Sequence, residues 1–164
     1  MAKKELLDVL NKQIAMEEHA SRSYLVLALW ADEAGFEGAA SFFYKQSEEE
    51  REHMHKFIRF ILETGGSPTV SNFPDTLPKA KSFKNLFEIG LKHEKAVTKS
   101  IHKIYELALK EKDYAAMNFL NWFVDEQVEE EDQFNTILGK IKLIEEHGGS
   151  IYMLDRELAM RAAK

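Results

Sequence analysis

Glu50 and His53 are the residues of this chain best placed to do chemistry, because they interrupt an otherwise apolar helical seam. Around them, apolar and small residues recur at steps of three and four, which predicts the buried face of an amphipathic helix. An unpaired buried carboxylate is too costly to keep, so it must be protonated, paired or bound to a metal ion. A Glu and a His three residues apart share one helical face and can hold one metal ion. The rest of this seam is Phe43, Ser47, Phe57 and Phe60.

Polar residues interrupt three further apolar seams. Glu17 and His53 lie equally far before and after a break at Gly35, so we expect them at one level of a helical hairpin. Across a second break, at Glu111, Glu94 matches the polar pair of the following helix. Charges that simply face solvent need not match in this way. The interruptions in these three seams are Glu17, Glu94, Gln127 and Glu130.

Four of these six side chains are carboxylates, and their charge indicates what they bind. Four carboxylates cannot share a dry core unless cations neutralise them or several are protonated, and two divalent cations would suffice. Hard oxygen ligands with a single imidazole suit iron or manganese, and zinc is compatible. The alternative is a polar layer that fixes helix register. Because six polar residues match in height and no Lys or Arg lies at this level, the pattern favours a metal site.

Four long helical patterns and a short fifth must position these residues. Gly65-Gly66 ends the second pattern, and residues 65–82 contain all three prolines, which indicates one long connection. A helix of thirty residues is about 45 Å long, and this connection can run back along it, making the second and third helices parallel. We therefore predict an all-α fold, a single domain over residues 1–164: a four-helix bundle with a long crossover and a short C-terminal helix. The predicted helices are 4–33, 39–63, 83–110, 114–146 and 150–160.

Composition narrows the class of protein. The 164 residues are 45% hydrophobic and 30% charged, which is typical of a globular domain with a full core. A formal net charge of -6 disfavours nucleic-acid and anionic-membrane partners and suits cationic ligands. The absence of cysteine excludes disulfides and thiolate ligands. With no signal-peptide pattern and no apolar run long enough for a membrane span, we expect a cytoplasmic protein.

These motifs resemble those of the bacterial non-haem ferritins, within the ferritin-like di-iron carboxylate family. Glu50-Arg51-Glu52-His53 matches the family's Glu-x-x-His motif. Gln127-Val128-Glu129-Glu130 departs from the second Glu-x-x-His of bacterioferritins and di-iron oxygenases, and this asymmetry is typical of ferritins. Bacterioferritins carry a haem-binding Met directly after the first Glu, where this chain has Arg51, so the resemblance implies no haem.

The resemblance implies iron storage coupled to ferroxidase activity. Two Fe(II) ions would bind inside one subunit and be oxidised by dioxygen or hydrogen peroxide, and Fe(III) would accumulate as a hydrated oxide inside a cage. Glu50 would bridge the two ions, with Glu17 and His53 completing the ligands of one ion. Glu94 and Glu130 would complete those of the other, and Gln127 would be a weak or indirect ligand.

The resemblance also suggests roles for neighbouring residues. Glu49, Glu126 and Glu129 would form a third iron site with Glu130, whereas the alternative is an ordinary solvated acidic face. Tyr24 would be a redox-active aromatic beside the iron pair; the alternative is a core tyrosine bonding a ligand carboxylate, and the two are compatible. We expect surface or subunit-contact roles for His19, His55, His93, His102 and His147.

The last predicted helix bears on assembly, because it is too small to add much to a monomer core. We expect Ile151, Leu154 and Leu158 to pack against other subunits of a hollow homo-oligomer, which the resemblance implies has twenty-four copies. Three other classes remain open: a soluble di-iron oxygenase or peroxidase, a metal-free structural bundle, and a DNA-protecting mini-ferritin. The first would usually need a second His where Glu130 stands, and the last lacks this fifth helix.

Overall fold

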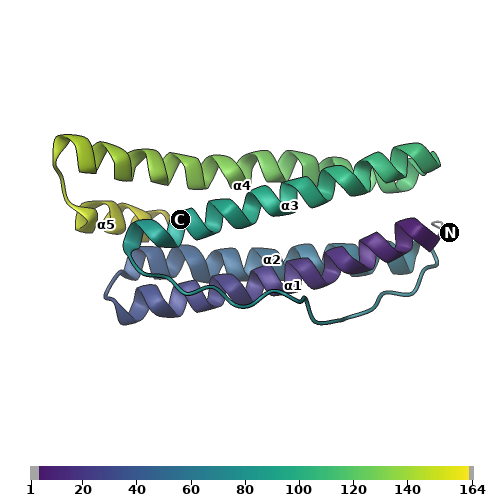
Figure 1. Cartoon of the computed structure of the whole chain (residues 1–164), viewed down its shortest axis with the longest axis horizontal. Coiled ribbons are helices and arrows are strands. Elements are labelled where there is room, and N and C mark those ends of the chain that lie inside the picture. Colours follow the sequence, from purple (N-terminus) through teal and green to yellow (C-terminus); the bar gives the residue numbers. More distant parts are fainter. Residues whose placement is uncertain (1–3, 163–164) are drawn as a thin grey trace.

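The computed structural model describes residues 4–162, which form five helices and no strand (Figure 1). The predicted all-α bundle with a long crossover and a short last helix is confirmed, and no predicted helix end is wrong by more than two residues. A single domain over 1–164 stays a prediction, and residues 1–3 and 163–164 lie outside the described residues. The helices are α1 Lys4–Glu33, α2 Glu37–Glu63, α3 Phe83–Glu111, α4 Tyr114–His147 and α5 Ile151–Ala162.

The crossover between α2 and α3 runs back along α1, so α2 and α3 are parallel, as the length of the connection predicts (Figure 1). Asn11 on α1 holds its first part: the amide donates to the Ser67 carbonyl at 3.3 Å, and its oxygen accepts the Thr69 N–H at 2.7 Å. Further along, Phe73 packs on His19 with ring centroids 5.2 Å apart. The crossover is therefore seated on α1 at more than one point.

Local signals set the helix ends and hence the register of the bundle. The Ser82 hydroxyl accepts the Asn85 N–H at 3.1 Å, and the Asp113 carboxylate accepts the Ala116 N–H at 3.0 Å, so α3 and α4 both begin at capping residues. Between α1 and α2 the chain turns at Gly35, whose φ of 81° suits glycine. These short turns bring each pair of antiparallel helices into the alignment that the polar residues need.

The core consists of two apolar clusters separated by a polar layer. One cluster gathers around Tyr24, Phe43 and Phe134, and the other around Leu10 and Phe57. In each long helix the predicted polar residues fall between the stretches that supply the two clusters. Tightly packed aromatic side chains on both sides therefore fix the polar layer in place.

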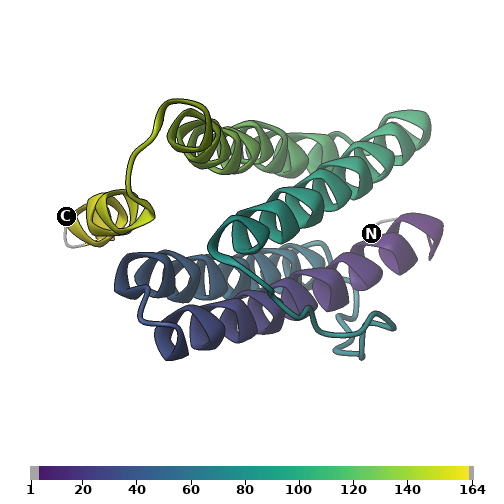
Figure 2. The ribbon, with the colours of Figure 1, turned by 60° about the vertical axis from the view of Figure 1, so that its left-hand side comes forward.

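The prediction that Leu154 and Leu158 pack against other subunits is wrong. Both are buried in the chain's own core, because α5 turns back and packs against the beginning of α2 (Figure 2). The buried Asp155 carboxylate accepts the N–H groups of Gly38 and Ala39 at 3.1 and 2.8 Å, which caps α2 from another helix. The large apolar residues of α5 left exposed are Tyr152, Met153 and Met160.

Gly38, one residue before the predicted start of the second helix at residue 39, instead lies within the first turn of α2. A Cβ at this position would collide with the backbone of Asp155, so glycine permits the close approach of α5. None of the five helices in the described part of the chain has a stretch long and apolar enough to cross a bilayer.

Candidate metal centre

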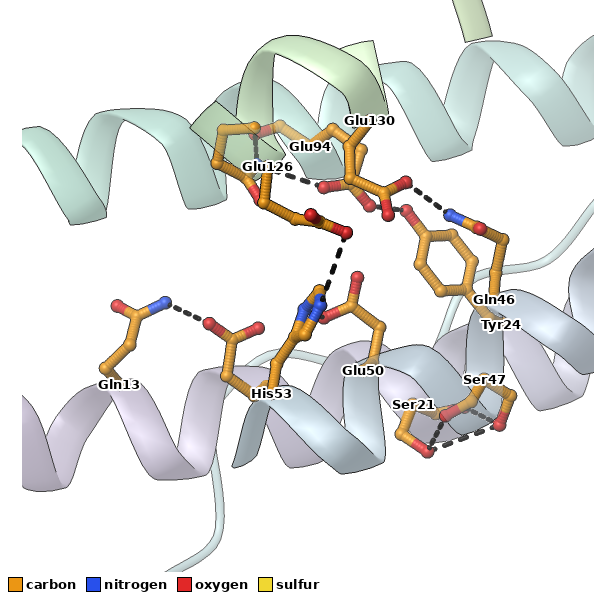
Figure 3. Close-up of polar contacts among 12 residues, drawn as sticks. Gln13, Ser21, Tyr24, Gln46, Ser47, Glu50, His53, Glu94, Glu126 and Glu130 are labelled. Carbon is orange, nitrogen blue, oxygen red and sulfur yellow. Dashed lines mark hydrogen bonds and ion pairs between the residues drawn. The ribbon is translucent and has the colours of Figure 1, made fainter. Parts of the chain in front are cut away.

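The six polar residues predicted for the metal site converge on one buried layer near the middle of the bundle. None is more than 3% exposed, and every long helix contributes at least one of them. Figure 3 shows Glu50 and His53 on α2 facing Glu94 and Glu130, which approach from the opposite pair of helices. The six residues are Glu17, Glu50, His53, Glu94, Gln127 and Glu130.

The half of the layer carried by α1 and α2 forms a compact group of ligand atoms. One atom each of Glu17, Glu50 and His53 lies within 4.8 Å of the others. The Oε2 atoms of Glu17 and Glu50 are buried and accept no hydrogen bond, although His53 Nδ1 lies 3.3 Å from Glu50 Oε2. Buried carboxylate oxygens without donors are costly, and a cation between them would remove that cost. This donor set therefore fits a divalent metal ion.

The half carried by α3 and α4 is held by internal hydrogen bonds. The Tyr24 hydroxyl donates to Glu94 Oε1, and the Gln127 amide donates to Glu94 Oε2 at 3.1 Å. The Gln46 amide donates to Glu130 Oε2 at 2.7 Å (Figure 3). These carboxylates are thus oriented by neutral donors from α1, α2 and α4 and have fewer free oxygen atoms than the α1–α2 half.

Burial raises the pKa of three carboxyl groups of this layer and so favours their protonated forms in the metal-free protein. It raises the pKa of Glu50 well above its ordinary value, and the charges of Glu94, Glu17 and Glu130 add to the shift. It raises the pKa of Glu94 to about 7, opposed by hydrogen bonds from Tyr24 and Gln127. It raises the pKa of Glu130 to about 8, where the charge of Glu94 contributes. A divalent cation can displace these protons, because it stabilises the carboxylate form.

Tyr24 contacts a carboxylate of the layer, as one of its two predicted roles requires. It is fully buried, and burial together with the charge of Glu94 raises the pKa of its phenol well above the ordinary value. The phenol therefore stays protonated and acts as a hydrogen-bond donor. A redox role for Tyr24 stays a prediction.

The residues predicted for a third iron site are only partly gathered. Glu126 Oε1 lies 3.9 Å from His53 Nε2 (Figure 3), and burial raises the pKa of Glu126, with contributions from the charges of Glu129 and Glu49. Glu129 is exposed, and Glu49 lies 3.5 Å from Lys45 Nζ. Among residues 4–162 these acids form no compact three-ligand group of their own. Glu126 therefore reaches the centre, while Glu49 and Glu129 remain at its rim.

Two buried amides, Gln13 and Gln46, were not expected from the sequence. Gln13 donates to Glu17 Oε1 at 2.8 Å, and Ser100 in turn donates to Gln13 Oε1 at 2.6 Å. Gln46 likewise donates a hydrogen bond to Glu130 Oε2. Each amide precedes a predicted ligand, Glu17 or Glu50, by four residues on the same helix. The helical period therefore places each amide on the same helix face as that ligand, and it could have indicated that both amides are buried.

Comparisons with known proteins agree with this architecture. A family model described as a ferritin-like domain matches residues 7–144. A bacterial non-heme ferritin of Staphylococcus haemolyticus is 38% identical over 162 residues, which are 99% of this chain and 98% of the relative. A probable bacterial non-heme ferritin-like protein of Haemophilus influenzae is 35% identical over 164 residues, which are 100% of this chain and 99% of the relative.

Solved structures give the same result in three dimensions. An open pore ferritin from the hyperthermophilic archaeon Archaeoglobus fulgidus superimposes with a TM-score of 0.90 at 36% sequence identity, covering 95% of each chain. Chlorobium tepidum ferritin superimposes with a TM-score of 0.86 at 36% identity, covering 97% of this chain and 98% of the other.

Proposed function

This chain belongs to the ferritin family, and we propose that it oxidises Fe(II) in the buried carboxylate layer and stores the resulting Fe(III) as a hydrated oxide. The observation that carries this proposal is the group of Glu17, Glu50 and His53, whose ligand atoms lie within 4.8 Å of one another between the two apolar clusters of the core. Four carboxylates and one imidazole are a donor set suited to iron.

The residues of the layer divide between two substrate ions. Glu17 and His53 would bind one Fe(II), Glu94 and Glu130 the other, and Glu50 both. The shared role of Glu50 is supported by its electrostatics, because the charges of Glu17, Glu94 and Glu130 all raise its pKa. Gln127 would act mainly by holding Glu94, to which its amide already donates.

Holding two Fe(II) ions close together supplies both electrons that the reaction needs. Each ion gives one electron to dioxygen, which takes up two protons and leaves as hydrogen peroxide. Protons displaced from Glu94 and Glu130 on metal binding are available nearby, because the pKa values of these groups in the metal-free protein are about 7 and about 8. The apolar clusters on either side exclude bulk water from the ions.

Storage requires a path for Fe(III) and an enclosed volume. The proposed path leads from the centre past Glu126 to Glu49 and Glu129, whose charges surround Glu126. The proposed container is a homo-oligomer of twenty-four subunits without haem. Exposed apolar residues on α5, Tyr152, Met153 and Met160, are consistent with contacts to other subunits. A cytoplasmic location stays a prediction from the sequence.

Two measurements on the purified protein test the proposal: assembly mass with iron content, and anaerobic Fe(II) titration followed by addition of dioxygen. We expect a large, monodisperse assembly that retains iron, two tightly bound Fe(II) per subunit, and rapid oxidation of both. A metal-free structural bundle would show no saturable Fe(II) binding. A soluble di-iron oxygenase would bind two Fe(II) but remain a monomer or small oligomer without stored iron.

A further inference from the structure

Two buried serines join α1 to α2 close to the candidate metal centre. Ser21 on α1 is 3% exposed, and Ser47 on α2 is 5% exposed. The Ser21 hydroxyl donates to the Ser47 carbonyl, and the Ser47 hydroxyl donates to the Ser21 carbonyl, each at 2.7 Å. The two hydroxyl oxygens lie 3.2 Å apart. Figure 3 shows this serine pair where α1 and α2 lie side by side.

The direction of these hydrogen bonds bears on the separation of the two helices. A serine inside a helix can donate to a carbonyl one turn earlier on its own helix, whereas these two donate to the opposite helix. A serine hydroxyl is only one carbon away from the backbone, so such a bond requires the two helix backbones to approach closely. Because the distance between packed helices depends on the side chains at their contact, the serine pair sets the separation of α1 and α2 at its level.

The serine pair lies about one helical turn from the predicted ligands of these two helices. Ser21 follows Glu17 by four residues and Ser47 precedes Glu50 by three, so each serine is next to a ligand on one helix face. The ligand atoms of Glu17, Glu50 and His53 lie within 4.8 Å of one another. A change in helix separation at the serines would therefore move Glu17 relative to the two ligands on α2.

The polar contacts of these ligands do not themselves tie α1 to α2. Gln13, which donates to Glu17, is on the same helix as Glu17, and His53, 3.3 Å from Glu50, is on the same helix as Glu50. The Oε2 atoms of Glu17 and Glu50 are buried without a hydrogen bond, so moving the helices apart would relieve a cost in the metal-free protein. The serine pair opposes this movement, because separation would break two buried hydrogen bonds.

We propose that the serine pair preorganises the α1–α2 half of the centre for Fe(II), an inference that rests on the proposed function. With the helices held together, the ligands stand close to one another before the ion arrives, so binding need not supply the free energy of assembling them. Ser21 and Ser47 are positioning residues, since they act through the helices and not on the ion. Their effect falls on Fe(II) affinity, because a bound ion itself holds the same ligands together.

Alanine substitution of both serines tests the proposal. Ser21→Ala with Ser47→Ala removes both hydrogen bonds between the helices, and each single substitution removes one of them. Ser23→Ala is the matched control, because Ser23 is also buried on α1, at 5% exposure, but lines a cavity beside the crossover. For each variant, anaerobic calorimetric titration with Fe(II) is followed by initial oxidation rates with dioxygen over a range of Fe(II) concentrations.

We expect the double variant to bind the ion of the α1–α2 half about five- to tenfold more weakly, and each single variant to fall between it and the parent. This loss is smaller than the roughly 10–100-fold typical of removing a direct partner of a metal ligand, because the serines act at one remove. The Fe(II) concentration that gives half of the maximal oxidation rate should rise by a similar factor. The maximal rate itself should stay within about twofold of the parent rate, and Ser23→Ala should match the parent throughout.

Three results would overturn the proposal. The first is parent-like Fe(II) affinity in the double variant, or in both single variants if the double variant does not fold. The second is a lower maximal rate with an unchanged half-saturating Fe(II) concentration, which would place the effect on the reaction and not on binding. The third is equal weakening in Ser23→Ala. A parent protein that binds no Fe(II) would instead refute the proposed function itself.

A pair of substitutions at Ser21 separates hydrogen bonding from packing. Ser21→Thr and Ser21→Val add similar bulk at the same position, and only threonine keeps a hydroxyl donor. We expect Ser21→Thr to bind Fe(II) at least about threefold more tightly than Ser21→Val, as the loss of one hydrogen bond implies. Equal affinities in these two variants would contradict the role proposed for the Ser21 hydroxyl.

Discussion

The two halves of the candidate metal centre present their carboxylates in different states. In the α1–α2 half, the Oε2 atoms of Glu17 and Glu50 are buried and accept no hydrogen bond. In the α3–α4 half, Glu94 accepts hydrogen bonds from Tyr24 and Gln127, and Glu130 accepts one from Gln46. One half therefore has oxygen atoms ready for a cation, and the other is occupied by donors from the protein.

This difference implies an order of binding. A first Fe(II) ion entering the α1–α2 half satisfies atoms that nothing else satisfies. A second ion in the α3–α4 half must in addition compete with the hydrogen bonds that Glu94 and Glu130 already accept. Both steps displace protons, because the pKa values of Glu50, Glu94 and Glu130 are all raised. We therefore expect stepwise binding that depends on pH, tight in the α1–α2 half and weaker in the α3–α4 half.

The largest effect should follow from removing Glu50, because it is the one residue proposed to bind both ions. We expect Glu50→Ala to lower the initial rate of Fe(II) oxidation at least about a hundredfold, measured by stopped-flow absorbance. The bundle should still fold, since the change removes a buried carboxyl group that lies close to the charges of Glu17 and Glu94. Glu48→Ala, at an exposed position of the same helix, is the control and should oxidise iron like the parent. An unchanged rate in Glu50→Ala would refute its shared role.

The second prediction concerns protons in the α3–α4 half. Folding raises the pKa of Glu94 from 4.5 to about 7 and that of Glu130 from 4.5 to about 8. Between pH 4.5 and about pH 8, the folded apo protein therefore holds more protons than the unfolded chain. The stability of the apo protein should therefore fall as pH rises through this range. We expect Tm to drop by at least about 5 °C between pH 5 and pH 8.5.

A double variant is the control for this pH dependence. Glu94→Gln with Glu130→Gln removes both titrating groups of the α3–α4 half and should reduce the slope, leaving the part that Glu50 contributes. If the parent and the double variant lose Tm equally over the same pH range, the pH dependence arises elsewhere in the molecule.

Substituting two buried amides should weaken Fe(II) binding in one half of the centre at a time. Gln46 donates to Glu130 and Gln13 donates to Glu17, at 2.7 and 2.8 Å. Loss of such a hydrogen bond to a metal ligand typically lowers metal affinity by about 10–100-fold. In calorimetric titrations with Fe(II), Gln46→Leu should weaken only the second binding step and Gln13→Leu only the first. If both variants weaken the same step, the proposed order of binding is wrong.

The smallest effect should come from the acids at the rim. Replacing Glu49, Glu126 and Glu129 together by Gln leaves the residues of both halves in place, so the first turnover should proceed within about twofold of the parent rate. Later turnovers should slow, because Fe(III) loses its proposed path out of the centre, and the Fe(II) oxidised per dioxygen should change. Metal-soaked crystals should show three sites per subunit in the parent and two in the variant. If the parent shows only two iron sites per subunit at saturating iron, these three residues form an ordinary solvated acidic surface and not a third iron site.

Much of this architecture could be read from the sequence because its signals are periodic. The seam through Phe43, Glu50 and His53 repeats along one helix face, and Gly35 marks the turn that brings Glu17 opposite His53. The length of the crossover alone predicted that α2 and α3 are parallel. Periodicity fixes which side chains point inward, so all six residues predicted for the centre are buried together.

Features that depend on irregular packing could not be read in the same way. The apolar face of α5 is visible in the sequence, but nothing there says that Leu154 and Leu158 pack inside their own subunit. His93 is partly covered because it lines a cavity beside the crossover, and an irregular connection has no period from which its course could be read. The donor role of Gln46 depends on a residue of another helix, Glu130, so only the structure could assign it.

Anomalous diffraction at the iron edge, from crystals loaded with Fe(II) without oxygen, tests the central claim most directly. The account predicts two iron peaks per subunit within the buried layer, about 3.5–4 Å apart, as in two-metal sites generally. Glu50 should contact both, with Glu17 and His53 on one ion and Glu94 and Glu130 on the other. At limiting Fe(II) the peak beside Glu17 should fill first. Iron found only at surface carboxylates, with no peak between Glu50 and its neighbours, would contradict the assignment of this layer as the site of oxidation.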